Sequence, residues 1–201
     1  MMQSRTLTVL ADGEEVTGLP HVRLSGRYGQ SLFPYPIFLR IWNAPETVDH
    51  RLRRAKKISV LHGETLLAAG DFVDVTREVV EEGNLITVTF APGFHFWNSW
   101  VSLSVGAGAT AGDTVRQLLA AAGSDMQLLT EPVNNAVFSR PQTFFGRLSE
   151  AILAVVSACS VRPYLVPAGI ALMPVNELEK EIVLDLDSVS VPWKMGEENV
   201  L

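Results

Sequence analysis

The residues from Gly106 to Gly112 have the composition of a loop that binds phosphate. They follow a β-patterned segment and open a helical pattern, and Glu131 lies about 20 residues further on, after a possible strand at Met126–Leu129. In a dinucleotide-binding βαβ unit, such glycines let the backbone approach a pyrophosphate, and a later acidic residue binds the ribose. A nucleotide-binding, Rossmann-like oxidoreductase is therefore one interpretation of this sequence.

Three features of the same region argue against nucleotide binding. The glycines are spaced G-x-G-x-x-x-G instead of the common G-x-G-x-x-G. The preceding segment, Trp100–Val105, alternates apolar residues with serines. That alternation is typical of a half-exposed antiparallel strand, whereas a central parallel strand is apolar on both faces. No further βαβ repeats follow, so we expect a loop between two domains and no bound cofactor.

Other reactive residue types do not form a recognisable site. Four histidines occur, none paired with another at metal-ligand spacing: His21, His50, His62 and His95. His95 lies near Ser99, but no strand–turn–helix motif presents this serine as a nucleophile. Cys159 lies inside an apolar helical pattern, which predicts a buried and inert thiol. We find no carboxylate pair suited to acid–base catalysis, so the sequence predicts no catalytic residues, no metal site and no enzyme.

The overall composition is that of an ordinary globular protein. Of 201 residues, 47% are apolar and 19% charged, and the net charge is −6. No run approaches the roughly 18 apolar residues of a membrane-spanning helix, and acidic residues follow the N-terminus too soon for a signal peptide. The acidic balance argues against a sequence-specific nucleic-acid binder. A basic cluster is expected to be solvated surface or to contact a partner subunit: Arg51, Arg53, Arg54, Lys56 and Lys57.

The first half of the chain consists almost entirely of β-patterned segments. The expected strands are Arg5–Leu10, Val22–Leu24, Pro36–Asn43, Ile58–Leu61, Phe72–Val75, Leu85–Phe90 and Trp100–Val105. Gly63, Gly70, Gly83 and Pro92-Gly93 separate the later ones, which is typical of an antiparallel meander that can close on itself. Pro36–Asn43 is bulky on both faces, and we expect it to be an edge strand able to pair with another subunit. One short helix is predicted at Glu46–Ala55.

The second half mixes helices and strands. A helix is predicted from Thr110, a capping residue, to Gly123, and another from about Thr143 to Cys159. A hairpin follows, formed by Arg162–Val166 and Ile170–Met173, and then a last strand at Ile182–Leu186. The predicted fold class is therefore α+β. It comprises an antiparallel β-barrel in residues 1–105, an α+β module with two helices in 106–176, and a C-terminal strand with a loose tail in 177–201.

Six aromatic residues are candidates for interface contacts. Two alternate along the bulky strand and four crowd one turn: Phe38, Trp42, Phe94, Phe96, Trp97 and Trp100. Large aromatic side chains most often fill a core or a domain junction, and otherwise they anchor contacts between subunits.

The order of these elements resembles the phage tail baseplate hub proteins of the late control protein D family. The segment Leu66–Val75, the strand Leu85–Phe90 and the Pro92-Gly93 turn are similar to the first, tail-tube-like barrel of these hubs. Further pieces of the resemblance are Val115–Leu119, Phe144-Phe-Gly146, Val166–Ile170 and Asp187–Pro192, so that it spans about residues 36–192. Two departures are Pro92, where the family has an aspartate, and the missing second barrel.

The resemblance implies a structural protein that works by assembly. Such hubs are trimers whose two barrels per chain form a pseudo-six-fold ring between tail tube and spike. Homo-oligomers, tube and spike proteins are thus the expected partners, with DNA passing through an acidic lumen and no membrane contact. The expected location is the virion tail baseplate, after synthesis in the bacterial host cytoplasm. A shortened hub, a hub fragment, half of a split hub, and an adaptor or chaperone of a related secretion apparatus are all compatible with one barrel.

Overall fold

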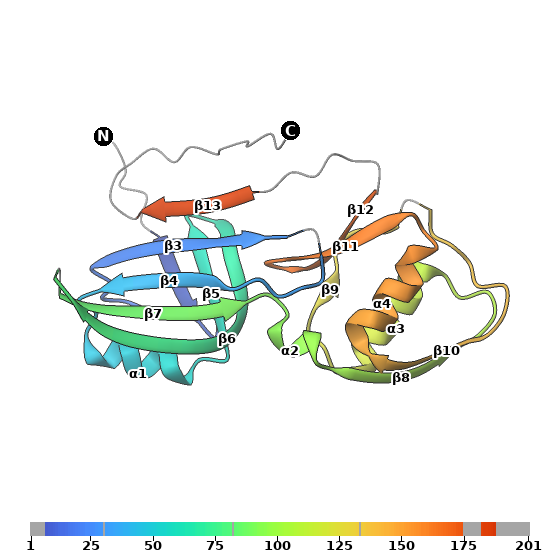
Figure 1. The fold of residues 1–201 in the computed structure, drawn as a ribbon, viewed down its shortest axis with the longest axis horizontal. Helices are drawn as coiled ribbons and strands as arrows, with labels where there is room; N and C mark the ends of the chain where they lie inside the picture. Colours follow the sequence, from blue (N-terminus) through green and yellow to red (C-terminus); the bar gives the residue numbers. More distant parts are fainter. Residues whose placement is uncertain (1–6, 30, 82, 133, 175–181, 188–201) are drawn as a thin grey trace. The chain divides into compact units, whose positions relative to one another are not determined.

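Alternating apolar residues build one large antiparallel sheet in this chain, as the computed structural model shows (Figure 1). The structure describes residues 7–29, 31–81, 83–132, 134–174 and, for the backbone, 182–187. Contacts divide the chain into two compact units. The first comprises Met1–Tyr28, Tyr35–Phe94 and Lys180–Leu201, and the second comprises Gly29–Pro34 and His95–Glu179. The sequence-based domain borders at residues 105 and 176 stay a prediction.

The sheet of the first unit has eight strands in the order β13-β3-β4-β7-β6-β5-β1-β2. Every neighbouring pair in it is antiparallel. The strands are β1 (Leu7–Ala11), β2 (Glu14–Glu15), β3 (His21–Tyr28), β4 (Ile37–Trp42), β5 (Lys57–His62), β6 (Thr65–Val80), β7 (Gly83–Ala91) and β13 (Ile182–Asp187). The predicted last strand thus pairs with β3, with Ile182 opposite Tyr28 and Asp187 opposite Arg23.

One face of this sheet forms the core of the first unit. In β4, Ile37, Leu39 and Ile41 are at most 2% exposed, while the residues between them are half-buried on the other face. The inward residues of β1, β3, β5, β6 and β7 join the same cluster. Because six strands share one core on one face, the sheet has to curl around it. The described strand pairs leave β2 and β13 at its two ends, and closure into a barrel stays a prediction.

The helix predicted near residue 50 is confirmed as α1 (Glu46–Arg54). Val48 and Leu52 lie four residues apart on its buried face and pack into the core of the first unit. Acidic residues occupy its first turn and basic residues its last turn, which matches the helix dipole. Figure 1 shows α1 beside β6.

The structure corrects two expectations about these strands. Pro36–Asn43 is not an edge strand, because β4 lies between β3 and β7 and pairs with both. Both of its hydrogen-bonding edges are therefore occupied, and it has none left for another subunit. Gly70 does not separate two strands as expected, because it lies inside β6, a single strand of 16 residues. Its first part pairs with β5, and from Asp71 onward it pairs with β7.

The described residues of the second unit form one short helix, two longer helices and two small sheets. Its elements are the short α2 (Phe94–Trp97), which begins at the border residue Phe94, then β8 (Trp100–Val105), α3 (Ala111–Ala121), β9 (Gln127–Leu128), β10 (Gln142–Arg147), α4 (Leu148–Ser157), β11 (Val161–Val166) and β12 (Gly169–Pro174). β8 pairs with β10, while β11, β12 and β9 form the other sheet. The apolar stripes of α3 and α4 form one core with Val101, Leu165 and Ile170. The α+β fold class is confirmed, as are the α3 helix and the β11–β12 hairpin.

Two further expectations are wrong in this unit. The helix predicted from about Thr143 begins only at Leu148, because Gln142–Arg147 forms β10 along the whole length of β8. Conversely, β8 does not extend the first sheet, because its described partner is β10. The intrinsic preference of a segment is weak compared with the hydrogen bonds of such a ladder.

Candidate assembly surface

The six candidate interface aromatics occupy three different environments. Phe38 and Trp42 lie half-buried on the outer face of β4, where Trp42 packs edge-on against His21 with 4.8 Å between ring centroids. Phe96 is 3% exposed and belongs to the core of the second unit. Phe94 is 37% exposed, and Trp97 packs edge-on against Phe33. Trp100 is 65% exposed, which leaves it the most open of the six.

Trp100 belongs to a two-stranded ribbon whose two faces differ sharply. On the inner face, Val101, Leu103 and Phe144 pack into the core formed with α3 and α4. The outer face, called here the ribbon face, consists of Trp100, Ser102, Ser104, Thr143, Phe145 and Arg147. All six residues alternate with the inward ones and are exposed. The ribbon therefore presents an exposed, partly aromatic outer face, while its inner face is anchored in the core.

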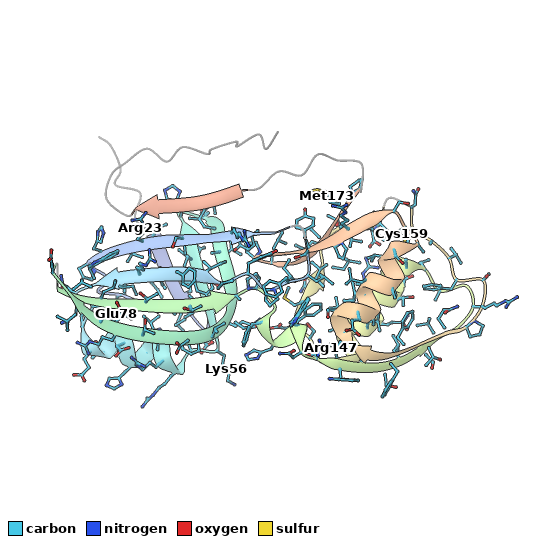
Figure 2. All side chains as sticks on the ribbon, in the orientation of Figure 1. Arg23, Lys56, Glu78, Arg147, Cys159 and Met173 are labelled. Carbon is cyan, nitrogen blue, oxygen red and sulfur yellow. The ribbon has the colours of Figure 1, made fainter. Side chains whose placement is uncertain are left out.

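The side chains on the ribbon face contact one another across the two strands. Trp100 and Phe145 meet edge-on with 6.1 Å between ring centroids, although Phe145 is 79% exposed. Arg147 is the register partner of Trp100, and Figure 2 labels it at the end of β10. A hydrogen bond of 3.0 Å joins the hydroxyls of Ser104 and Thr143. Sequence reasoning missed Phe145 and Arg147, since it placed both in a helix; the alternation along residues 142–147 was the available signal.

The glycine loop does not have the geometry of a dinucleotide site. The strand before it, β8, is antiparallel to β10, whereas a βαβ unit needs a parallel partner. The first four N–H groups of α3 all donate within the protein: Ala111 to Ala136 O (2.8 Å), Gly112 to Asn135 Oδ1 (2.9 Å), Asp113 to Thr110 Oγ1 (3.2 Å) and Thr114 to Thr110 O (2.9 Å). A pyrophosphate would need these donors.

Glu131, the expected ribose ligand, has a structural partner instead. Its carboxylate forms an ion pair with Arg116 of α3, which also binds Asp113 at 3.2 Å. Two carboxylates therefore lie near the start of this helix, where they would repel a phosphate. The loop from Gly106 to Gly112 thus works as a connection, and the residues around it stabilise the start of α3.

Replacing the capping residue of α3 is expected to destabilise the second unit by about 1 kcal/mol. Thr110→Ala removes the hydroxyl that accepts from Asp113 N and donates to the Asp113 carboxylate at 2.8 Å. Urea unfolding measures the loss. Thr110→Ser keeps the hydroxyl and serves as the control, so equal losses in the two variants would contradict the capping role.

The basic cluster lies beside a groove of the first unit. The groove has a volume of about 680 Å³ and lies between α1 and the β1–β2 turn. Arg51 binds Glu14 at 2.9 Å across it, and the Asp12 carboxylate accepts hydrogen bonds from the backbone N–H groups of Lys56 and Lys57. Acidic neighbours therefore offset part of the positive charge, and the cluster does not form a continuous basic face.

Little else in the described chain suggests chemistry. In the ranges that the structure describes, no group of three or more His, Cys, Asp or Glu side chains could hold a metal ion. None of the helices described is both long and apolar enough to cross a membrane. Cys159 is 1% exposed, as expected for an inert thiol. Burial raises the pKa of the Tyr28 phenol, which donates to Leu67 O at 3.4 Å and so has a structural role.

Comparison with solved structures finds the fold of this chain in tail proteins. The tail protein from Neisseria meningitidis MC58 superposes with a TM-score of 0.62 at 14% identity, covering 83% of this chain and 49% of that one. The 43 kDa tail protein of prophage MuSo2 from Shewanella oneidensis gives a TM-score of 0.62 at 10% identity, covering 84% and 54%. This chain has the fold of phage tail proteins. The resemblance inferred from the sequence is confirmed at that level.

A third structure extends the tail-protein fold to a secretion apparatus. It is an E. coli component of the type VI secretion system, described as structurally similar to bacteriophage tail proteins, with a TM-score of 0.52 at 11% identity. The match covers 82% of this chain and 48% of the secretion component. This chain thus spans about half the length of each of the three structures. No protein-family model and no curated protein matches the sequence.

Proposed function

We propose that this chain is a structural component of the baseplate hub of a phage, or of a phage-like injection apparatus. Its work is assembly: copies of the chain associate and join a tail tube to a spike. The observation that carries the proposal is the shared fold, which covers more than four-fifths of this chain in each of two phage-type tail proteins and a secretion component. Its proposed location is the tail baseplate of the virion, after synthesis in the host cytoplasm.

The length of the matched structures suggests how the hub is completed. Because the chain spans only about half of them, the rest of a hub would come from another chain or from a further part of the same protein. We infer a homo-oligomer, a trimer or another ring, in which DNA passes through the lumen without sequence-specific contacts. The net charge of −6 supports such a lumen because like charges keep DNA from adhering.

The alternative hypothesis, a nucleotide-binding oxidoreductase, has no geometric support in the described residues. The antiparallel partner of β8 and the satisfied N–H groups of α3 both argue against it. We therefore expect no nucleotide chemistry at the Gly106–Gly112 loop.

Mixing the chain with tube and spike proteins of a phage tail tests the proposed function. We expect a complex of fixed stoichiometry containing several copies of the chain, measured by light scattering coupled to size exclusion and visible as a ring by electron microscopy. The same preparation should show no thermal shift with NAD or NADP. A chain that stays monomeric and binds neither the tube nor the spike protein would contradict the proposal.

A further inference from the structure

Large apolar side chains are unusually open at two places in this protein. The three most exposed ones among the described residues are Val79 at 84%, Phe145 at 79% and Trp100 at 65%. Phe145 and Trp100 lie together on the ribbon face, and Val79 lies at the end of the β6–β7 hairpin. Exposed apolar side chains that lie together, as Trp100 and Phe145 do, mark contact sites more often than single scattered ones do.

The ribbon face is aromatic and carries positive charge. Its only charged residue is Arg147, and Arg140 is exposed just before β10. The sequence has no Asp or Glu in residues 83–112 or 132–149, the two segments that supply the ribbon. In a chain with a net charge of −6, the two strands of the ribbon therefore carry no acidic residue. Such a face favours a partner that is both apolar and acidic.

The end of the β6–β7 hairpin has that complementary character. We call Glu78, Val79 and Glu81 the acidic tip; all three are exposed, and Figure 2 labels Glu78 on β6. The segment 77–82 reads Arg-Glu-Val-Val-Glu-Glu, so three acids outnumber one base.

The acidic tip is presented on a well-anchored hairpin. Val79 pairs with Asn84 in the β6–β7 ladder. Asn84 in turn is held by Asn43, whose side chain accepts from Asn84 N at 3.1 Å and whose backbone N–H donates to Asn84 O at 2.7 Å. A residue held in a paired strand loses little conformational entropy when it binds, which favours the use of Val79 in a contact.

We propose that the acidic tip of one copy of this chain docks on the ribbon face of a second copy. Val79 then covers the Trp100–Phe145 pair, and Glu78 or Glu81 pairs with Arg147. This inference rests on the proposed function, because it names the surfaces through which the copies of the hub associate. The two surfaces differ, so the contact is head-to-tail, the type that produces closed rings or open filaments. Aromatic residues and arginine are the usual energetic centres of such interfaces.

Mixed cysteine variants test the contact directly. The Val79→Cys protein is mixed with the Phe145→Cys protein and oxidised, so that a disulfide between the two positions joins only different copies. We expect a covalent dimer in the mixture and far less in either variant alone; Cys159 is buried and should not react. Equal dimer yields in all three samples, or no dimer in the mixture, would overturn the proposal.

Charge reversal gives a second and independent readout. Arg147→Glu and Glu78→Arg should each weaken self-association by about 10-fold or more, measured by sedimentation. An equimolar mixture of the two variants should regain association, because the reversed charges face each other again. Glu64→Arg, at an exposed acid outside both surfaces, is the matched control and should associate like the unaltered chain. Unchanged association in both single variants would count against the contact.

The outcomes separate this inference from the proposed function. If the chain assembles with tube and spike proteins but neither the disulfide nor the charge pair forms, the contact is wrong and the hub function stands. If the chain neither self-associates nor binds those proteins, both are wrong. Circular dichroism checks that each variant is folded, which is expected because every altered side chain is exposed.

Discussion

Ile152→Ala is expected to destabilise the second unit by about 2–5 kcal/mol. Ile152 is fully buried in α4, and its side chain belongs to the core that α3, α4 and the adjoining strands share. Removing three carbons there loses the transfer free energy of those carbons and leaves a cavity that the packed helices can fill only in part. Urea unfolding gives the change in the free energy of unfolding.

Hydrogen exchange locates where the effect of Ile152→Ala falls. Because the first unit has its own core, exchange should accelerate in α3, α4 and β8 and stay unchanged in β3, β4 and β7. Exchange should also accelerate around Ser31 and Leu32. Leu32 is 2% exposed in the core of the second unit, and Leu165 N donates to Ser31 O at 3.2 Å. Uniform acceleration in both units would contradict two separate cores.

The neighbouring residue provides a matched control. Leu153 lies on the same helix but is 46% exposed. Leu153→Ala should change the free energy of unfolding by about 0.5 kcal/mol or less, as is usual for a surface position. If the two variants lose equal stability, the loss does not come from the burial of Ile152 in the core, because alanine favours a helix at least as much as isoleucine or leucine does.

Gly70→Ala is expected to destabilise the first unit by about 3 kcal/mol. A β-carbon at this position would overlap the carbonyl group of Ala91 and lie 2.7 Å from the nitrogen of Pro92. Both neighbours are backbone, so neither can rotate away, and β6 or β7 would have to shift. Replacing a glycine inside a strand by alanine ordinarily stabilises it by about 0.5–1 kcal/mol, so the expected sign is the opposite of the usual one.

Gly106→Ala is the control for Gly70→Ala. A β-carbon at Gly106 would meet no atom within 4 Å, so this variant should be neutral or slightly stabilised. Chemical denaturation of the two variants side by side measures the contrast. Similar free energies of unfolding for Gly70→Ala and the unaltered chain would show that β6 does not approach Ala91 so closely.

The ribbon face illustrates why the candidate site was only half predictable. Trp100 could be chosen from the sequence because large aromatics are common at interfaces. Phe145 could not, because residues 143–159 satisfy a helical pattern nearly as well as a strand followed by a helix. The decision came from β8, which lies about 40 residues earlier in the sequence and supplies the ladder for β10. A partner that distant leaves no local signal.

What the sequence determined by itself is local structure and which face of each strand is buried. The helices α1 and α3, the β11–β12 hairpin and the alternation of β4 follow from periodicity, capping and turn residues, which act over a few positions. The ordered set of these elements was also enough to show the resemblance to tail proteins.

What only the tertiary structure decided is which strand pairs with which. Alternation is the same for an edge strand and a central one, so it could not show that β4 has two partners or that β13 lies beside β3. Gly70 has the same ambiguity, because a glycine permits both a turn and the close approach of another backbone. These choices depend on contacts between residues far apart in the chain, where the free energy comes from ladders and a shared core and not from the local sequence.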